Sequence, residues 1–307
     1  HTRWNCSSRG LGDVYKRQPM MSQADQVVAL ADLSLNSELE VIRALSSAAK
    51  KANRTHGVLL MVELGDLREG IMPGDLEHTV REILRFPRIA FKGIGTNLAC
   101  RSGVAPDGTN MAALSALADS IDATFGPIVS TVSGGNSAFL AWALSGADSG
   151  RINDLRLGEA LLLGREPLHR QAIKGLHTDA ITLIAVVIES KVKPSKPWGE
   201  IAQSAFGEAP PADDVGSISQ SILAIGRQDT DPTGLETPRG IEILSASSDH
   251  LVVASGNDRA PLTVGAEIPF GLNYSALLRA MTSPFVDKVM KTTTARPRAE
   301  TAGSSRA

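Results

Sequence analysis

The chain has 307 residues, which is long enough for two domains. Its formal net charge is −2 and 42% of its residues are hydrophobic, so its composition argues against nucleic acid or an anionic membrane surface as the main partner. Its longest apolar runs are far too short to span a bilayer. The two cysteines cannot form a disulfide framework and no Cys/His cluster has zinc-ligand spacing, so we predict a cytoplasmic protein without a metal site.

Both ends of the chain look foreign to the fold. Residues 1–19, called the leader below, have no hydrophobic periodicity, no start methionine and no signal-peptide pattern. They resemble the read-through artefacts found at the ends of assembled environmental sequences. Residues 292–307 are polar and basic, which predicts disorder. We therefore exclude both segments from the predicted fold.

Residues 20–177 alternate between apolar strands and amphipathic helices, a pattern typical of a parallel sheet covered by helices. The predicted strands are residues 27–35, 57–65, 88–97, 127–135 and 152–164. The predicted helices are residues 36–53, 73–86, 111–126 and 136–146. The sequence thus predicts an α/β first domain.

Residues 178–291 have a different, β-rich pattern. Strand-like segments separated by Gly, Pro and Asp turns are residues 181–192, 217–228, 240–256 and 263–273. A long loop covers residues 193–214, and a helix is predicted at residues 274–283. We predict that this part is a second domain.

In a parallel α/β protein, active and binding sites lie at the C-terminal ends of the strands. Here those ends read "DLSLNSE", "ELGDLREG", "GIGTNLAC", "SGGNSA" and "LRLGEA". Any one of them could be an ordinary turn and helix cap, but five in succession favour a shared site. The stretch "SGGNSA" runs from a strand through two glycines into a helix, where free N–H groups and the helix dipole converge, so it predicts an anion site.

Arg68 and Arg156 each follow a predicted strand end, where a guanidinium could bind a carboxylate, a phosphate or a ring nitrogen. The alternative for each is a surface salt bridge. The carboxylates near enough in sequence to pair with them are Glu63, Asp66, Glu69 and Glu159. The stretch "GIGTN" lacks the third glycine of a dinucleotide fingerprint, and no acidic residue follows at the required distance, which argues against a Rossmann domain.

Together these motifs resemble the alanine racemase-like, fold-type III enzymes that use pyridoxal 5'-phosphate (PLP), in particular the amino-acid racemases that include ornithine racemase. The motifs are "SLNSELE", "MVELGDLREGI", "GIGTNLACRSG", "SGGNSA", "LRLGEALLLGRE", "KPSKPWGE", "ILAIGRQD", "ASSDHL" and "AMTSPF". The resemblance implies a (β/α)8 barrel, of which about five β/α units are present here, followed by a C-terminal β domain. It also implies a homodimer whose active sites are completed across the interface.

The resemblance assigns the predicted anion to the PLP phosphate. Ser137, with Asn136 beside it, matches the phosphate-binding serine of the family. Gly158 and Glu159 match positions whose backbone N–H groups hold the same phosphate. Arg156 matches an arginine that faces the pyridine nitrogen and keeps it unprotonated, because a second buried positive charge is costly.

Further roles follow from the same resemblance. Arg68 matches an arginine near the substrate and the ring oxygen of the cofactor. Asn97 stands where relatives carry a ring-stacking histidine. Asp249 matches a substrate-side position that the β domain of the partner subunit contributes.

Two departures from the family concern the catalytic bases. The Schiff-base lysine of the family lies on the first barrel strand, and no lysine here matches it: Lys16 lies in the leader, Lys92 precedes "GIGTN", and Lys191 and Lys193 belong to the second domain. We therefore expect the chain to be inactive alone.

The second departure is the tyrosine that serves the opposite face of the Cα, since inversion needs a base on each side. Its position falls in "AIGRQD", and the chain's two tyrosines are Tyr15 in the leader and Tyr274 at the start of the last helix. Asp229 or His250 is the predicted substitute, and a structural hydrogen-bonding role is the alternative for His250.

The predicted function is a PLP-dependent amino-acid racemase of the ornithine, lysine or alanine type. It would interconvert the L and D forms of a small amino-acid substrate by Cα deprotonation and reprotonation. The alternatives are another fold-type III enzyme (a D-amino-acid aldolase, a dehydratase or a decarboxylase), a non-catalytic PLP-binding protein, or a barrel that binds a sugar or nucleotide phosphate. The β-rich second domain argues against the non-catalytic proteins, which are single barrels.

Overall fold

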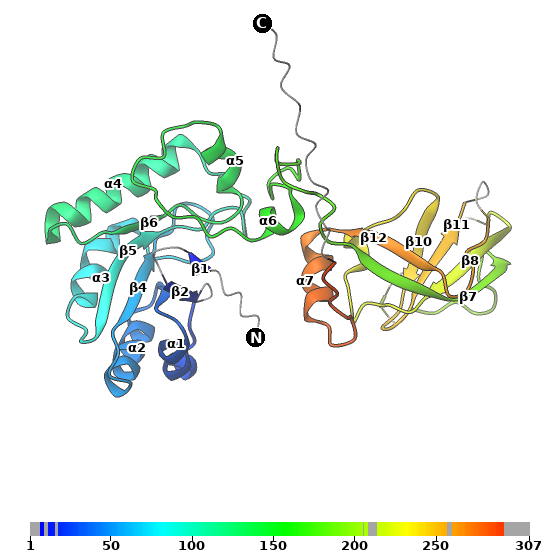
Figure 1. Cartoon of the computed structure of the whole chain (residues 1–307), viewed down its shortest axis with the longest axis horizontal. Coiled ribbons are helices and arrows are strands. Elements are labelled where there is room, and N and C mark those ends of the chain that lie inside the picture. The colour runs from blue at the N-terminus through cyan, green and yellow to red at the C-terminus, as the bar shows by residue number, and fades with distance from the viewer. Residues whose placement is uncertain are drawn as a thin grey trace, which may run out of the picture. The chain divides into compact units, whose positions relative to one another are not determined.

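The structure is a computed structural model that describes residues 7–8, 12–15, 18–204, 206–207, 214–256 and 260–291. The chain divides into two compact units, His1–Ile181 and Thr182–Ala307, close to the predicted boundary after residue 177 (Figure 1). Each unit is considered by itself below. The predicted tail, residues 292–307, lies outside the described residues, as does Lys16.

The first unit is built on a six-stranded sheet with the order β1-β2-β3-β4-β5-β6. Its strands are β1 (Ser7–Ser8), β2 (Gly12–Tyr15), β3 (Leu33–Asn36), β4 (His56–Met61), β5 (Ile89–Gly95) and β6 (Thr131–Ser133). β1 and β2 are antiparallel, and the other neighbouring pairs are parallel. The C-terminal ends of β3 to β6 therefore lie along one edge of the sheet.

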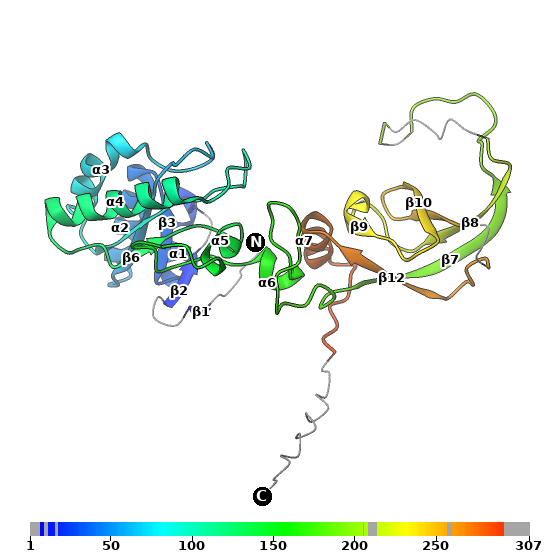
Figure 2. The ribbon, with the colours of Figure 1, turned by 90° about the horizontal axis from the view of Figure 1, so that it is seen from above.

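Helices cover one face of this sheet (Figures 1 and 2). The helical segments are η1 (Met21–Gln23), α1 (Ala24–Leu30), α2 (Leu39–Lys51), η2 (Pro73–Asp75), α3 (Leu76–Ile83), α4 (Gly108–Phe125), α5 (Phe139–Leu144) and α6 (Glu159–Leu163). A buried cluster joins Leu60 of β4 to Ile42 of α2, Val80 of α3 and Leu114 of α4. Leu59 of β4 belongs to a separate buried cluster with β3, so β4 buries residues on both faces, as its continuous apolar sequence predicts.

Two of the five predicted strands of this unit need correction. The strand predicted at residues 27–35 is wrong for its first half, where α1 forms and packs Val27 and Val28 against α2. A short apolar run cannot be assigned to helix or strand by its periodicity alone. The strand predicted at residues 152–164 reduces to one parallel bridge between Ser133 and Asp154, after which α6 begins.

The leader also differs from expectation. Residues 1–19 were predicted to lie outside the fold, but β2 pairs in parallel with β3, with Tyr15 opposite Ser34. Without this pairing β3 would be an open edge strand, and any extended segment can satisfy its backbone groups. The remaining predicted strands and helices of the unit are confirmed.

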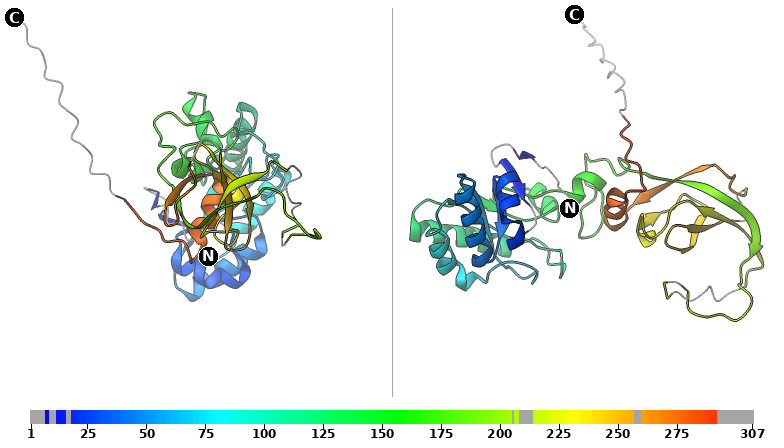
Figure 3. Two further views of the ribbon diagram at one scale, coloured as in Figure 1. Left: turned by 90° about the vertical axis from the view of Figure 1, so that its right-hand side faces the viewer. Right: turned by 90° about the horizontal axis from the view of Figure 1, so that it is seen from below.

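The second unit is an antiparallel sheet with the order β10-β11-β8-β7-β12-β9. Its elements are β7 (Leu183–Pro194), β8 (Ser217–Leu223), η3 (Pro232–Gly234), β9 (Leu235–Glu236), β10 (Ile241–Ala246), β11 (Leu251–Ser255), β12 (Glu267–Leu272) and α7 (Tyr274–Thr282). The long strand β7 curves strongly, as Figures 2 and 3 show. The β-rich prediction is confirmed, except that residues 240–256 form a hairpin of two strands instead of one.

Candidate functional site

The loops after β4, β5 and β6 carry most of the predicted site residues of the first unit. Arg68 and Glu69, after β4, form an ion pair in which Arg68 Nη2 lies 2.6 Å from Glu69 Oε1. This hydrogen bond raises the pKa of Arg68. Asn97 follows β5, and Asn136 follows β6.

Arg156 ties two of these loops together. Its Nη1 donates to Ser133 Oγ at 2.5 Å, and its Nη2 donates to the carbonyl oxygen of Thr96 at 2.7 Å. Its backbone N–H donates to the carbonyl oxygen of Gly135 at 2.8 Å. The guanidinium is thus held from the ends of both β5 and β6.

Charged groups of the neighbouring loops act on Arg156. Burial lowers the pKa of Arg156 and the Arg68 cation lowers it further, whereas the Asp154 and Glu69 carboxylates oppose that change. Arginine keeps its proton in proteins, so the group remains a fixed cation. Arg156 is therefore a buried cation whose charge is balanced most strongly by Asp154.

Ser137 lies at the centre of a convergence of hydrogen-bond donors. Its buried hydroxyl oxygen accepts the backbone N–H groups of Gly158 and Ala160, each at 3.1 Å. Gly135 reaches this arrangement with a φ of +127°, which favours glycine. Ser137 and Gly158 were predicted from the sequence, whereas Ala160 was missed because only backbone geometry reveals it.

Glu159, predicted as a further phosphate contact, lies between these two amides. Its carboxylate pairs with Arg170, so its side chain is engaged outside the Ser137 cluster. No contact of its own backbone N–H with Ser137 is found among the described residues. Its cofactor role stays a prediction.

Asn97 and Asn136 are neighbours in the site. Asn136 Oδ1 accepts the N–H of Ala138 at 2.8 Å, and its Nδ2 donates to Leu98 O at 2.8 Å and contacts Cys100 Sγ at 3.1 Å. Both ends of Asn136 are therefore engaged within the protein. Asn97 is only 7% exposed, yet its Nδ2 has no hydrogen-bond partner among the described residues.

Asp66 organises the loop after β5. Its buried carboxylate accepts the backbone N–H groups of Cys100, Arg101 and Ser102 at 3.0 to 3.1 Å. Burial alone would raise the pKa of this carboxyl, but hydrogen bonds from backbone N–H groups, these three and that of Val104, outweigh burial and lower the pKa. The loop that begins at Asn97 is thereby fixed to the loop after β4.

In the second unit, the structure brings the predicted residues into one pair of loops. Gln228 N donates to Ser248 O at 2.9 Å, which joins the loop of Asp229 to the loop of Asp249 and His250. Asp249 Oδ1 lies 3.2 Å from His250 Nδ1, and both side chains are exposed. The hydrogen bond from Ser248 lowers the pKa of Asp249.

Asp229 has a different environment. It is buried, and its carboxylate accepts the Ser283 hydroxyl at 2.8 Å and the Gly226 N–H at 3.3 Å. These contacts tie the loop to the end of α7. Its role as a base stays a prediction that this burial does not favour, whereas His250 and Asp249 are accessible.

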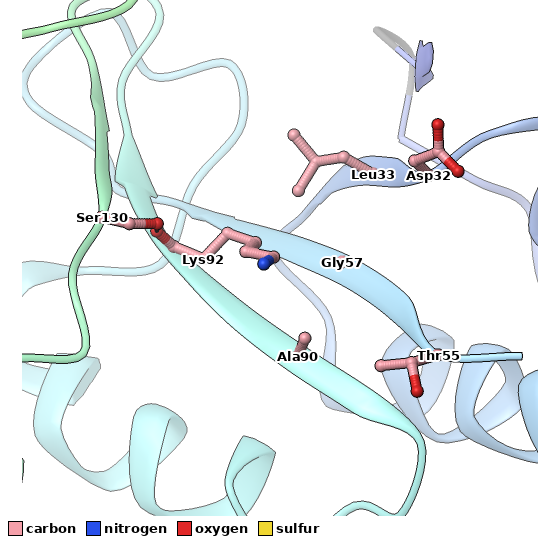
Figure 4. A pocket seen from close by; sticks show the side chains of 7 residues that line it. All are labelled: Asp32, Leu33, Thr55, Gly57, Ala90, Lys92 and Ser130. Atoms are coloured by element: carbon pink, nitrogen blue, oxygen red, sulfur yellow. Dashed lines mark hydrogen bonds between the residues drawn. The ribbon is translucent and has the colours of Figure 1, made fainter. Parts of the chain in front are cut away.

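A cavity of about 370 Å³ lies elsewhere in the first unit (Figure 4). It is lined by Asp32, Leu33, Thr55, Gly57, Ala90, Lys92 and Ser130, which lie at or near the beginnings of the strands. Figure 4 shows the Lys92 amine directed across the sheet toward Gly57. The cavity therefore belongs to the opposite edge from the predicted site.

The donor set at the strand ends fits a phosphorylated pyridine cofactor. The Ser137 hydroxyl and the Gly158 and Ala160 amides suit a phosphate, and the buried Asn97 Nδ2, which has no partner among the described residues, requires an acceptor. Among the described residues, no group of three or more His, Cys, Asp or Glu side chains is placed to hold a metal ion. Within the same residues, no helix is long and apolar enough to cross a bilayer.

Comparison with known proteins agrees with this chemistry. The model of the alanine racemase N-terminal domain family matches residues 15–166. An ornithine racemase from Acetoanaerobium sticklandii is 42% identical over 274 residues, which cover 89% of this chain and 78% of the relative. The chain belongs to the alanine racemase family. The predicted resemblance is thus confirmed.

A second relative of this racemase family is a lysine racemase from Thermotoga maritima, 36% identical over 274 residues that cover 89% of this chain and 76% of the relative. Both relatives are racemases, which supports the predicted isomerase class of enzyme.

Solved structures show the shared fold. An alanine racemase from Clostridium difficile 630 has a TM-score of 0.61 at 17% identity, covering 88% of this chain and 70% of that one. A D-threonine aldolase from Filomicrobium marinum has a TM-score of 0.61 at 17% identity, and this chain spans 66% of its length with 84% of its own. An alanine racemase from Bartonella henselae with covalently bound pyridoxal phosphate has a TM-score of 0.58 at 16% identity, covering 83% of this chain and 68% of that one. The predicted fold class is confirmed, with an incomplete barrel-like sheet followed by a β domain.

Proposed function

We propose that this chain is the larger part of a PLP-dependent amino-acid racemase whose cofactor site lies in the first unit. The observation that carries the proposal is the convergence of the Ser137 hydroxyl with the Gly158 and Ala160 amides, next to a buried arginine. The racemase relatives at 42% and 36% identity support the reaction class.

Ser137, Gly158 and Ala160 would hold the cofactor phosphate, and Arg156 would face the pyridine nitrogen. When bound, PLP withdraws electrons from the substrate Cα and so makes its proton removable. Arg156 keeps its own proton, so it disfavours protonation of a nitrogen placed against it. The unpartnered Asn97 Nδ2 would donate to an acceptor atom of the cofactor, which satisfies a buried donor.

The substrate is proposed to be a basic amino acid, ornithine or lysine, as the relatives' names suggest. Arg68 would bind the substrate carboxylate at the mouth of the site. Glu69, which already pairs with Arg68, is the acidic side chain best placed to meet a basic group, because Asp66 is committed to three backbone amides. The alternative substrate is alanine, which is smaller and has no basic side chain.

The proton steps require a base on each face of the Cα, and none of the lysines described in the first unit lies at the predicted site. These lysines are Lys50, Lys51, Lys92 and Lys174, and Lys92 lies at the opposite edge of the sheet. We propose that this chain alone holds the cofactor non-covalently and does not turn over. Asp249 and His250 of a second copy are the proposed contributors on the other face of the Cα, in a cytoplasmic homodimer.

A racemase assay tests the proposal. The full chain is incubated with PLP and L-ornithine, and D-ornithine is followed by chiral chromatography beside a Ser137→Ala/Arg156→Ala double variant. We expect PLP binding in the parent but not in the double variant, and no D-ornithine from either. Absence of PLP binding would reject the cofactor site, and turnover by the parent would reject the proposed inactivity while supporting the reaction.

The structural similarity to a D-threonine aldolase does not favour a second activity, because at 17% identity it shows only a shared fold. An aldolase remains the alternative fold-type III reaction, and release of glycine from D-threonine in the same incubation would reveal it.

A further inference from the structure

Behind Arg156 lies a second layer of polar contacts that no predicted role uses. Ser133 is fully buried, and its hydroxyl oxygen accepts Arg156 Nη1 at 2.5 Å. The same hydroxyl donates to the Asp154 carboxylate. A serine therefore connects a buried cation to a carboxylate, with its single proton directed toward the acid.

The backbone fixes this layer in place. Ser133 and Asp154 form a parallel bridge, in which Gly134 N donates to Asp154 O at 3.0 Å and Asp154 N donates to Val132 O at 3.3 Å. The carboxylate is thus anchored to the end of β6, the strand that leads into the Ser137 loop. Its position does not depend on a flexible surface segment.

Asp154 also balances the charge of the site. The Arg68 guanidinium disfavours the charge of Arg156, and Asp154 is the carboxylate that favours this charge most strongly. A buried cation needs both hydrogen bonds and a counter-charge to be tolerated. Glu69 pairs with Arg68, whereas Asp154 is joined to Arg156 through the Ser133 hydroxyl.

We infer that Ser133 and Asp154 are positioning residues that hold the Arg156 guanidinium in the orientation required by the cofactor ring. This inference rests on the proposed function, because it assumes that Arg156 contacts PLP. Ser133 acts by direct hydrogen bonding, and Asp154 acts through Ser133 and by its charge. Neither residue touches the cofactor.

A double-mutant cycle on cofactor affinity tests this directly. PLP is titrated into the full chain and followed by its absorbance, in the parent, Ser133→Ala, Arg156→Ala and the double variant. Loss of a hydrogen bond to a charged group weakens binding roughly tenfold to a hundredfold. We expect that loss for Arg156→Ala and a smaller loss, about tenfold, for Ser133→Ala, which acts through Arg156. The double variant should bind no worse than Arg156→Ala, because both changes remove the same contact.

Two further comparisons separate positioning from general damage. Ser130→Ala removes a hydroxyl that donates to Lys92 O at 2.9 Å just before the same strand, and it should leave PLP affinity unchanged. Asp154→Asn keeps an acceptor for the Ser133 proton, so it should weaken binding less than Asp154→Ala. Urea unfolding of each variant checks that it folds. If Ser133→Ala fails to fold, the PLP affinity of Asp154→Asn is compared with that of the parent instead.

The outcomes are distinct for the two proposals. If the parent does not bind PLP, the proposed function fails and this inference fails with it. If Arg156→Ala weakens binding while Ser133→Ala and Asp154→Ala match the parent, only the positioning role is overturned. Fully additive losses in the cycle would also overturn it, because Ser133 would then act independently of Arg156.

Discussion

At the scale of single residues, Asp66 shows how a buried carboxylate can shape a site without taking part in it. Its carboxylate accepts three successive backbone N–H groups from the loop after β5. From the sequence alone, Asp66 was instead a candidate ion-pair partner for Arg68 or Arg156. Three converging amides cannot be read from a sequence, because they depend on how a separate loop folds back.

Replacing Asp66 with asparagine tests this role. The amide group would turn a donor toward N–H groups that need acceptors, so we expect the free energy of unfolding to fall by about 2 kcal/mol or more. Urea denaturation of the purified chain measures the change. Asp25→Asn is a matched control, because it disrupts only an exposed ion pair with Lys51 and should cost less than about 1 kcal/mol. Equal effects for both variants would contradict the account.

At the scale of elements, a buried histidine joins β3 to the start of β4. His56 is 1% exposed and its Nε2 lies 2.7 Å from Ser34 Oγ. Burial lowers the pKa of His56 to about 4 from its ordinary 6.5, so the folded protein holds this ring neutral where the unfolded chain takes up a proton.

Stability should therefore fall as the pH falls from 6.5 toward 4. The pKa of His56 is lower in the folded protein than in the unfolded chain. The stabilisation from keeping His56 neutral is therefore complete above pH 6.5, and it is lost between pH 6.5 and 4, which lowers the free energy of unfolding by about 3 kcal/mol in all. Urea unfolding at a series of pH values measures it. His56→Gln should flatten the profile in this window, whereas His78→Gln, at an exposed position of α3, should not. An unchanged slope in His56→Gln would refute the assignment.

A glycine controls how β5 approaches β6. Gly93 has a φ of +142°, and a Cβ added there would lie 1.9 Å from the carbonyl oxygen of Thr131. Gly93→Ala should lower the free energy of unfolding by more than about 3 kcal/mol, because both the clash and the backbone conformation oppose it.

Gly108→Ala is the control for that change. Gly108 begins α4 and has open space around it, so alanine there should change stability by less than about 1 kcal/mol. Comparable stability of the two variants in urea would mean that the close approach of β5 and β6 is not required.

At the scale of the whole molecule, the sequence predicted the order of α/β and β-rich parts, because hydrophobic periodicity reports burial directly. It misassigned residues 27–30, which belong to α1, because a short apolar run fits helix and strand alike, and it did not foresee that Gly12–Tyr15 would join the sheet. For the proposed site, the motifs predicted Ser137, Gly158 and Arg156, which the structure brings to neighbouring loops. Ser133, Asp154 and Ala160 were missed, because their contribution lies in the contacts they make.

The end of β6 and the start of α6 are proposed to form a phosphate site for PLP. The most direct test compares the affinities of PLP and of pyridoxal, which lacks the phosphate, for the full chain and for Ser137→Ala. We predict that the parent prefers PLP by roughly a hundredfold and that Ser137→Ala loses most of this preference while keeping its affinity for pyridoxal. Equal affinity of the parent for the two compounds, or a preference that survives Ser137→Ala, would contradict the account.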